Sequence, residues 1–269
     1  MVWTPATRAQ HDRNSLRYAS DLTDEEWTLL EPFMPPQPRH GRKRQVCFRD
    51  VVSGIFYVLQ SGCPWRMLPK DFPPKSTVHR YFQLFARQGL WDQIMGALHH
   101  RLREKEGRNG QPTYAIIDSQ SAKTGPNASK DKGFDAGKKV KGRKRHIVVD
   151  TLGFILKADV HAANIQDRDG CKYVFDKLTH YFPFLVAMCG DGGYAGPIAQ
   201  GHCPRQLDIV KRNQAGFEVL PIRWIVERSF AWIGINRRMV VDHERYKETT
   251  LAFMHLAMIK IIIRRLARN

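Results

Sequence analysis

The sequence predicts an α/β fold in which a mixed sheet flanked by helices follows a small all-helical region. Two patterns support this class. Before residue 110, apolar residues recur at helical spacing, whereas after it short β-branched segments alternate with segments of helical length. Elements in this order form an α/β domain. We expect a flexible N-terminus over residues 1–20, a helical domain over 21–108 and the α/β domain over 109–269.

Four helices are predicted in the first part of the chain. Residues 23–26 form a capping box, which starts a helix that Pro35 and Pro36 end. Apolar side chains then recur at helical spacing in three further segments. These helices run from Val51 to Gly62, from Ser76 to Gly89 and from Trp91 to Leu102.

The predicted helix from Ser76 to Gly89 follows a proline-rich turn and carries basic residues on its polar face. This order fits a helix-turn-helix DNA reader, in which Lys75, His79 and Arg80 would contact DNA. A plain helical subdomain with a solvated basic face has the same pattern. The sequence leaves both interpretations open.

Five short strands are predicted beyond residue 110, at residues 113–118, 146–150, 154–160, 184–189 and 207–210. Residues 167–180 have helical length and spacing, and helices over 219–235 and 249–266 complete the chain. We expect the last helix to pack on the sheet, the more common arrangement, or to form a dimer seam.

The charge balance points to a polyanionic partner. Lysine and arginine outnumber aspartate and glutamate by 43 to 26, which gives a formal net charge of +17. Such a field attracts nucleic acid. The segment between the first two strands concentrates this charge in nine basic residues: Lys123, Lys130, Lys132, Lys138, Lys139, Lys141, Arg143, Lys144 and Arg145. We expect it to bind DNA phosphates, although a solvated charge run has the same composition.

The cysteines and the apolar segments exclude other classes of protein. Five cysteines without C-x-x-C spacing form neither a disulfide framework nor a zinc knuckle. No segment has the length and composition of a signal peptide or a membrane span. We therefore expect a cytoplasmic, nucleoid-associated protein with no membrane partner and no small-molecule cofactor.

Three acidic residues lie where an α/β domain would form a site. Asp118 ends the first strand, Asp191 follows the fourth strand between glycines, and Glu227 lies on the helix that follows. Carboxylates are the hard oxygen ligands that Mg²⁺ prefers, and two Mg²⁺ ions can support in-line reactions of phosphodiesters. From pattern alone, Asp150 at the next strand's end is an equally eligible ligand. Arg223 and Glu227 also have the spacing of an ordinary helical ion pair.

Several longer segments resemble the transposases of small bacterial insertion sequences, in the family whose type element is insertion sequence five. The similar segments are SDLTDEEWTLLEPFMP (20–35), RDVVSGIFYVLQSGCPWRMLPKDFPPKSTVHRYF (49–82), IIDSQSAKTG (116–125), GRKRHIVVDTLGFIL (142–156), GDGGYAG (190–196) and FEVLPIRWIVERSFAWIGINRRM (217–239). They cover nearly the whole chain. The resemblance implies a ribonuclease-H-like catalytic domain of the DDE type.

The resemblance assigns roles to individual residues. The catalytic and metal-binding triad falls on Asp118, Asp191 and Glu227. The family signature around the glutamate matches at Arg223, which is also a candidate DNA contact, but Leu220 stands at its tyrosine position and Gly234 at its lysine position. The basic residues Arg237 and Arg238, with Asn236, lie one turn further along and are candidates to replace the lysine in DNA contact.

The resemblance also implies an activity and its partners. Such a transposase would bind the terminal inverted repeats, cleave the element ends with two Mg²⁺ ions and join the 3′-hydroxyl to target DNA, with Mn²⁺ able to substitute. A homodimer on double-stranded DNA is the expected assembly. Two alternatives stay open: a catalytically inactive, transposase-derived DNA-binding protein, and a ribonuclease-H-like nuclease that does not integrate DNA.

Overall fold

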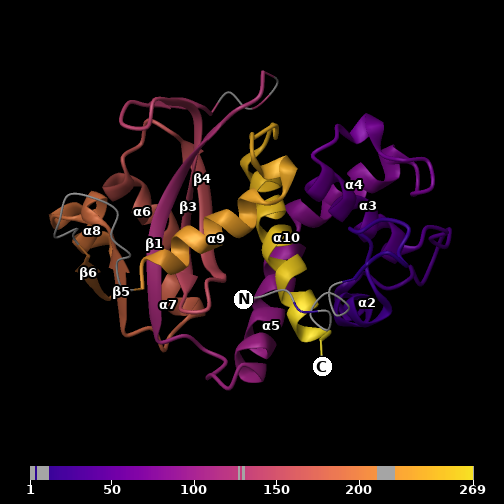
Figure 1. Ribbon diagram of the computed structural model, residues 1–269, viewed down its shortest axis with the longest axis horizontal. Coiled ribbons are helices and arrows are strands. Elements are labelled where there is room, and N and C mark those ends of the chain that lie inside the picture. Colours follow the sequence, from indigo (N-terminus) through magenta and orange to yellow (C-terminus); the bar gives the residue numbers. More distant parts are fainter. Residues whose placement is uncertain (1–3, 5–11, 127, 129–130, 211–221, 269) are drawn as a thin grey trace.

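The computed structural model describes residue 4 and residues 12–126, 128, 131–210 and 222–268. Figure 1 shows a sheet on one side and the N-terminal helices on the other, with the long C-terminal helix α10 between them. Of the N-terminal segment 1–20, residues 1–3 and 5–11 lie outside the described residues. No helix in the described part of the chain is long and apolar enough to cross a membrane.

The four predicted N-terminal helices are present. They are α2 (Asp24–Leu30), α3 (Phe48–Ser61), α4 (Lys75–Arg87) and α5 (Leu90–Lys105). The capping box is confirmed, because the Thr23 hydroxyl accepts the Glu26 amide at 3.2 Å while the Glu26 carboxylate accepts the Thr23 amide at 3.1 Å. Helix α4 begins one residue before the expected cap at Ser76, with Pro74 at the N-cap position.

The connection between α3 and α4 differs from that of a helix-turn-helix unit. Gly62 ends α3 in the left-handed conformation, with φ of 72°, and residues 63–74 then intervene with a 3-10 turn over Trp65–Met67. The DNA-binding motif joins its helices by about three or four residues. Helices α3 and α4 pack together, but they are not joined as in that motif.

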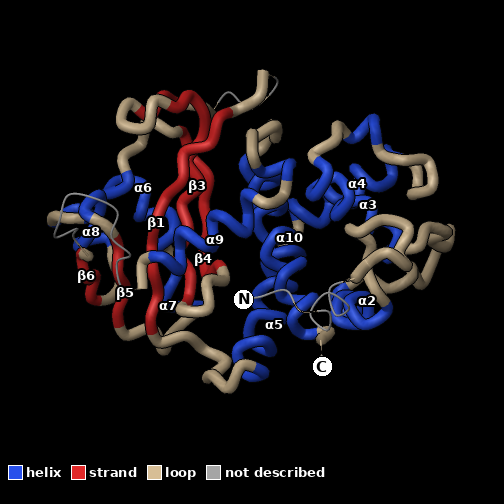
Figure 2. Tube along the Cα trace, viewed as in Figure 1, coloured by secondary structure: helices blue, strands red, loops and turns tan. Residues whose placement is uncertain are grey.

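Within the described residues the sheet has six strands, and Figure 2 shows the strands in red. They are β1 (Tyr114–Lys123), β2 (Gly133–Asp135), β3 (Val140–Asp150), β4 (Ile155–Ala162), β5 (Ala187–Gly190) and β6 (Gln206–Ile209). β3 pairs antiparallel with β1 on one side and with β2 and β4 on the other. On the far side of β1, β5 pairs parallel with β1, and β6 pairs parallel with β5. This mixed sheet, flanked by helices, confirms the α/β class and has a ribonuclease-H-like fold.

The basic segment between the first two strands is mostly strand rather than loop. β1 and β3 pair from Ala115 opposite Asp150 to Lys123 opposite Gly142, so both extend well beyond their expected limits at residues 118 and 146. The short strand β2 was not predicted at all. The lysines and arginines of β3 conceal the apolar alternation on which strand prediction depends.

Helices cover both faces of the sheet. The helix expected over 167–180 is divided into α6 (Asp167–Phe175) and α7 (Leu178–Tyr181), because Asp176 is extended and Lys177 has a φ of 54°. α6 packs on β3 and β4, whereas α9 (Trp224–Gly234) packs on β1 and β3. The short helix α8 (Pro197–His202) packs on α6. The expected start of α9 at residue 219 lies outside the described residues.

Successive residues of β1 face these two helices alternately. Ile116 belongs to the same buried cluster as Phe230 of α9, whereas Ile117 belongs to the cluster with Val174 of α6. By the two-residue period of a strand, Asp118 lies on the α9 face and Ser119 on the α6 face. The alternation therefore directs Asp118 toward the helix that carries Glu227.

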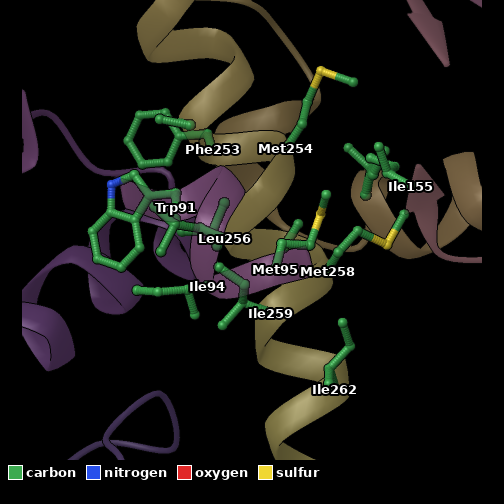
Figure 3. Close-up of a cluster of buried hydrophobic side chains, with 14 of the residues drawn as sticks. Trp91, Ile94, Met95, Ile155, Phe253, Met254, Leu256, Met258, Ile259 and Ile262 are labelled. Carbon is green, nitrogen blue, oxygen red and sulfur yellow. The ribbon is translucent and has the colours of Figure 1, made fainter. Parts of the chain in front are cut away.

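The C-terminal helix α10 (Lys247–Leu266) packs on both the sheet and the N-terminal helices. Figure 3 shows Leu256 and Ile259 of α10 beside Ile94 and Met95 of α5, with Ile155 of β4 on the other side. Of the two expected arrangements, packing on the sheet is therefore confirmed, and contact with α5 is added. The apolar face that a dimer seam would need is buried within the chain itself.

Candidate active site

Asp118 and Asp191 lie side by side where the interior strands β1 and β5 are neighbours. Asp118 is within β1, and Asp191 directly follows β5. The two strands are parallel neighbours in which Ile116 pairs with Cys189. The positions two residues further along each strand are therefore adjacent, and the two carboxylates meet.

One guanidinium group faces both carboxylates. Nη2 of Arg223 lies 3.6 Å from Oδ2 of Asp191 and 3.9 Å from Oδ2 of Asp118. The Oδ1 atoms are engaged elsewhere, since that of Asp118 accepts the Ser119 amide at 2.7 Å and that of Asp191 accepts the Gly193 amide at 2.9 Å. Both carboxylates therefore direct their remaining oxygen toward the same cation.

The backbone before α9 places Arg223 at this point. Arg223 is the N-cap residue of α9 and is 8% exposed. The preceding Ile222 has a φ of 70°, which a β-branched residue rarely adopts. Such a conformation costs about 1–3 kcal/mol and persists where the surrounding structure imposes it, often at functional sites. The Arg223 side chain faces the two aspartates and, within the described part of the chain, forms no ion pair with Glu227.

The Asp118 carboxyl is the more perturbed of the two acids. Burial raises its pKa to about 7, and the negative charge of Asp191 acts in the same direction. The Ser119 amide, Arg223 and Lys138 oppose this shift. Burial and the neighbouring charge disfavour two ionised carboxylates at this point, and a bound cation would relieve that cost by displacing the proton of Asp118.

Glu227 does not join the two aspartates in this structure. It lies on α9 one turn after Arg223, with its side chain exposed. Among the residues that the structure describes, no three acidic, histidine or cysteine side chains lie close enough together to hold a metal ion. The structure thus brings two of the three predicted ligands together and leaves the third on the neighbouring helix.

Asp167 is an additional acid at this site. In the sequence it follows the third predicted strand, where it could line the site or simply form a loop. Its Oδ1 accepts the Ser119 hydroxyl at 2.7 Å and the Lys144 ammonium at 2.7 Å. A Cβ at Gly193 would lie 3.4 Å from its Oδ2 and 2.9 Å from Oδ1 of Asp191. Asp167 is the first residue of α6, and its contact with Ser119 places it beside β1.

Asp150, the competing metal ligand, has a structural role. Its carboxylate is fully buried and lies 3.0 Å from His99 Nε2, with Arg103 also in contact. Its Oδ1 accepts the amides of Leu152 and Phe154, both at 3.0 Å. These partners occupy both oxygens of the Asp150 carboxylate. Asp118 and Asp191 therefore remain the candidate metal ligands.

The predicted DNA-binding residues divide into exposed and buried groups. Seven basic side chains from the prediction are exposed: Lys75, Arg80, Lys123, Lys138, Lys139, Lys141 and Arg237. Five are buried: Arg143, Lys144, Arg145, Arg223 and Arg238. His79 is half-buried and packs on Trp65 with ring centroids 4.9 Å apart.

The buried basic side chains form ion pairs or donate hydrogen bonds to backbone carbonyls. Arg143 lies 3.1 Å from Asp242, and Arg145 donates to the Met239 carbonyl at 2.7 Å. Arg238 pairs with Glu244 at 2.5 Å. The expectation that Arg143, Lys144 and Arg145 contact phosphates is therefore wrong for this structure, because β3 directs them into the protein.

One exposed lysine of the β2–β3 hairpin lies next to Asp118. Lys138 donates from Nζ to the Ser119 carbonyl at 3.2 Å, one residue from Asp118. The following Lys139 has a φ of 53°, in the left-handed region. The tight turn therefore places positive charge where a DNA strand would approach the aspartates.

Comparison with known proteins gives a consistent result along the chain. A family model described as a putative transposase of the IS4/5 family matches residues 22–95. A second, described as a transposase DDE domain, matches residues 109–263. No solved structure matches the chain significantly.

Two relatives come from Burkholderia cepacia. The chain is 35% identical over 106 residues to the insertion element IS402 uncharacterized 16.2 kDa protein, a match that covers 37% of this chain and 71% of that protein. It is 27% identical over 184 residues to a putative transposase for insertion sequence element IS402, which covers 61% of this chain and 84% of that protein.

Proposed function

Because the chain belongs to the transposase DDE domain family, we propose that it cleaves DNA at the ends of an insertion sequence and joins those ends to target DNA. The observation that supports this most directly is the convergence of Asp118 and Asp191 on Arg223, at 3.9 and 3.6 Å. A phosphodiester reaction needs cations at this point to stabilise the charge that develops on the attacking and leaving oxygens.

The donor set fits Mg²⁺. The Oδ2 atoms of Asp118 and Asp191, which face Arg223 in the free protein, are hard oxygen ligands, and a magnesium site needs few of them because water and substrate phosphate complete the coordination. Two bound Mg²⁺ ions would neutralise the transition state and activate the attacking water or hydroxyl. We assign Asp118 and Asp191 as metal ligands and Glu227 as the third, with Mn²⁺ as a substitute metal.

The remaining residues of the site would position the DNA. Arg223 balances the charge of the acid pair in the free protein and keeps its carboxylates aligned. The exposed side chains Lys123, Lys138, Lys139 and Lys141 would provide phosphate contacts, and Lys138 lies next to Asp118 through its contact with the Ser119 carbonyl. Lys75, Arg80 and Arg237 are further candidates for contact with the element ends. We also propose action as a homodimer, with the nucleoid in the cytoplasm as the place of action.

The proposal is tested by incubating the purified chain with its gene and flanking DNA in Mg²⁺ or EDTA and mapping every new 3′ end. We expect metal-dependent nicks at two inverted repeats, followed by joining to target DNA. Asp118→Asn, Asp191→Asn and Glu227→Gln should each abolish the nicks while DNA binding persists. Glu248→Gln, which changes an exposed acid at the start of α10, is the matched control and should cut normally.

The outcome also decides between the alternatives. Binding without nicks in Mg²⁺ and Mn²⁺ alike would favour an inactive, transposase-derived DNA-binding protein. Cutting without any joined product would favour a nuclease. Normal cutting by the Glu227→Gln variant would remove Glu227 from the proposed triad, which matters because its side chain lies apart from the two aspartates in the free protein.

A further inference from the structure

Three polar side chains are buried behind the acid pair, and the proposed chemistry uses none of them. Tyr194 and His146 are fully buried, and His161 is 8% exposed. Tyr194 ends the 3-10 turn Gly192–Tyr194, whose N-cap residue is Asp191. His146 lies on β3 and His161 on β4. Buried polar groups of this kind are costly unless each one has a partner.

The three side chains form one continuous chain of hydrogen bonds. The Tyr194 hydroxyl lies 2.7 Å from Nε2 of His146. Nδ1 of His146 lies 3.3 Å from Nε2 of His161. The chain ends where Nδ1 of His161 lies 3.1 Å from the Ala162 carbonyl oxygen.

This last acceptor fixes the direction of every bond. A carbonyl oxygen only accepts, so Nδ1 of His161 carries the hydrogen. Burial lowers the pKa of both imidazoles, that of His146 to about 3, so both rings are neutral. A neutral ring has one donor and one acceptor nitrogen. His146 therefore donates from Nδ1 to His161, and its Nε2 accepts the hydrogen of the Tyr194 hydroxyl.

The surrounding glycines leave space for this chain. A Cβ at Gly170 of α6 would lie 2.7 Å from Nε2 of His161 and 3.0 Å from Nδ1 of His146. A Cβ at Gly190 would lie 2.9 Å from the Tyr194 ring. Any other residue at either position would displace the rings, so the packing on both sides is matched to the hydrogen-bonded chain.

The 3-10 turn Gly192–Tyr194 connects this chain of hydrogen bonds to Asp191. The Tyr194 amide donates to the Asp191 carbonyl at 3.0 Å, and the Gly193 amide donates to Oδ1 of Asp191 at 2.9 Å. With Tyr194 held by His146 on β3, the turn cannot rotate about its two glycines. The carboxylate of Asp191 then keeps its Oδ2 directed toward Asp118 and Arg223.

We propose that Tyr194, His146 and His161 are positioning residues that fix Asp191 as a metal ligand. The inference rests on the proposed function, because it assumes that Asp191 binds the metal. Gly192 and Gly193 allow the turn many conformations, and without an anchor Asp191 would be ordered only when metal binds. Hydrogen-bonded groups that orient metal ligands typically change metal affinity by about 10–100-fold when they are removed.

The test compares Tyr194→Phe with the full-length wild type. This variant keeps the ring and removes the hydrogen bond to His146. The matched control is Tyr173→Phe, since the Tyr173 ring packs at a tilt on His161, with ring centroids 5.5 Å apart, while the residue is 38% exposed. Mn²⁺ binding is titrated on each protein without DNA, by the electron paramagnetic resonance signal of free Mn²⁺. We expect the Kd for Mn²⁺ to rise about tenfold in Tyr194→Phe and to stay unchanged in Tyr173→Phe.

A second pair of variants separates the two bonds of His146. In His146→Gln the amide oxygen takes a position near that of Nε2 and still accepts from Tyr194. In His146→Asn the amide lies near the Nδ1 position, so the bond to His161 is kept and the bond to Tyr194 is lost. We expect Gln to retain most of the Mn²⁺ affinity and Asn to lose it, an order that general loss of packing does not predict.

DNA cutting gives an independent readout. The Mg²⁺ concentration for half-maximal cutting should rise in Tyr194→Phe, while kcat at saturating Mg²⁺ and the Kd for DNA change little. A merely destabilised protein would instead lose kcat, because fewer molecules are folded. Equal Mn²⁺ affinity in folded Tyr194→Phe and wild type would overturn the inference.

The two proposals fail in different ways. A wild type that binds Mn²⁺ but cuts no DNA overturns the proposed function, and the Mn²⁺ titration alone then decides the inference. A wild type that binds neither Mn²⁺ nor Mg²⁺, with or without DNA, overturns both.

Discussion

His99 on α5 and Asp150 at the end of β3 form a buried hydrogen bond of 3.0 Å between Nε2 and Oδ2. Arg103, one turn later on α5, contacts the same carboxylate oxygen. The other oxygen holds the β3–β4 turn through two backbone amides. One carboxylate therefore ties the N-terminal helices to the sheet that carries the candidate active site.

Replacing Asp150 by Asn should destabilise the whole chain. The amide keeps a hydrogen-bond acceptor but leaves the buried Arg103 without its counter-charge, and breaking a buried ion pair in this way costs about 3–5 kcal/mol. We expect that loss in urea unfolding measured at pH 7. As a control, Asp176→Asn changes an exposed carboxylate and should unfold like the wild type. A loss below 1 kcal/mol for Asp150→Asn would contradict the role given to this contact.

The same contact predicts how stability depends on pH. Burial alone would raise the pKa of Asp150, but the hydrogen bond from His99, the nearby positive charges and the Phe154 amide hold it below its usual value. A carboxyl group with a lowered folded-state pKa stabilises the protein above its unfolded-state pKa of about 3.9. That contribution is lost as the pH falls further. We expect the difference in unfolding free energy between wild type and Asp150→Asn to shrink in acid titrations below about pH 4.

Replacing Arg223 by Gln should make stability depend more strongly on metal. The variant removes the cation that faces Asp118 and Asp191 and leaves two carboxylates in mutual repulsion. At pH 8 in EDTA we expect a lower unfolding temperature than that of the wild type. Added Mn²⁺ should then raise this temperature more than in the wild type, because the ion replaces the lost charge and competes with no guanidinium. Thermal unfolding followed by circular dichroism measures both changes.

Arg228→Gln provides the matched control on the same helix. The Arg228 guanidinium stacks between Trp224 and Trp232, 4.6 Å from each ring centroid. Its loss should lower stability without changing the response to Mn²⁺. An equal Mn²⁺ response in wild type and Arg223→Gln would show that the guanidinium does not share a site with the metal.

The sequence predicts most of the helices and the order of the strands, because apolar periodicity is strong in those segments. It fails between residues 123 and 145, where β3 is read as a loop. Arg143 and Arg145 lie within this strand, yet they are buried through contacts with Asp242 and the Met239 carbonyl. These partners are distant in sequence, so no local pattern identifies a buried arginine.

The candidate site is predicted in part for a similar reason. Asp191 is identifiable because it follows a strand and lies between glycines, and Asp118 because it follows the apolar residues of β1, although that strand continues to Lys123. Parallel pairing of β1 and β5 brings the two acids together. The anchoring of Tyr194 depends on His146, which is 48 residues away. That contact follows from the register of β1 with β3 and from the position of the β5 turn, which a single sequence does not specify.

Replacing Lys139 by Gly should weaken DNA binding without disturbing the hairpin. Lys139 has a φ of 53°, so glycine fits this backbone without strain and removes only the charge. If Lys139 contacts a phosphate, the slope of log K against log salt concentration falls by about 0.9. Fluorescence anisotropy on labelled DNA at several salt concentrations measures the slope.

Lys177→Gly is the matched control for this charge. Lys177 is also an exposed lysine, with a φ of 54°, but it lies between α6 and α7. The two variants lose the same charge and relieve the same backbone conformation. An equal change of slope in both would mean that net charge, and not the hairpin beside Asp118, determines DNA affinity.

Replacing Lys260 by Met should stabilise the protein near neutral pH. Lys260 of α10 is 9% exposed, and burial lowers its pKa from 10.5 to about 7. The unfolded chain therefore binds more protons than the folded one between these values, so the wild type gains stability as the pH rises from about 7 to 10. Methionine has no charge to bury and fills a similar volume, although the contacts of Nζ with Gln60 and Asn236 are lost.

We expect a higher unfolding temperature for Lys260→Met at pH 7, by about 2–4 °C per kcal/mol gained, and a flatter pH dependence of the unfolding temperature. Lys247→Met at the exposed start of α10 should change neither quantity, and a Lys260→Met protein that is less stable at pH 7 than wild type would contradict the prediction.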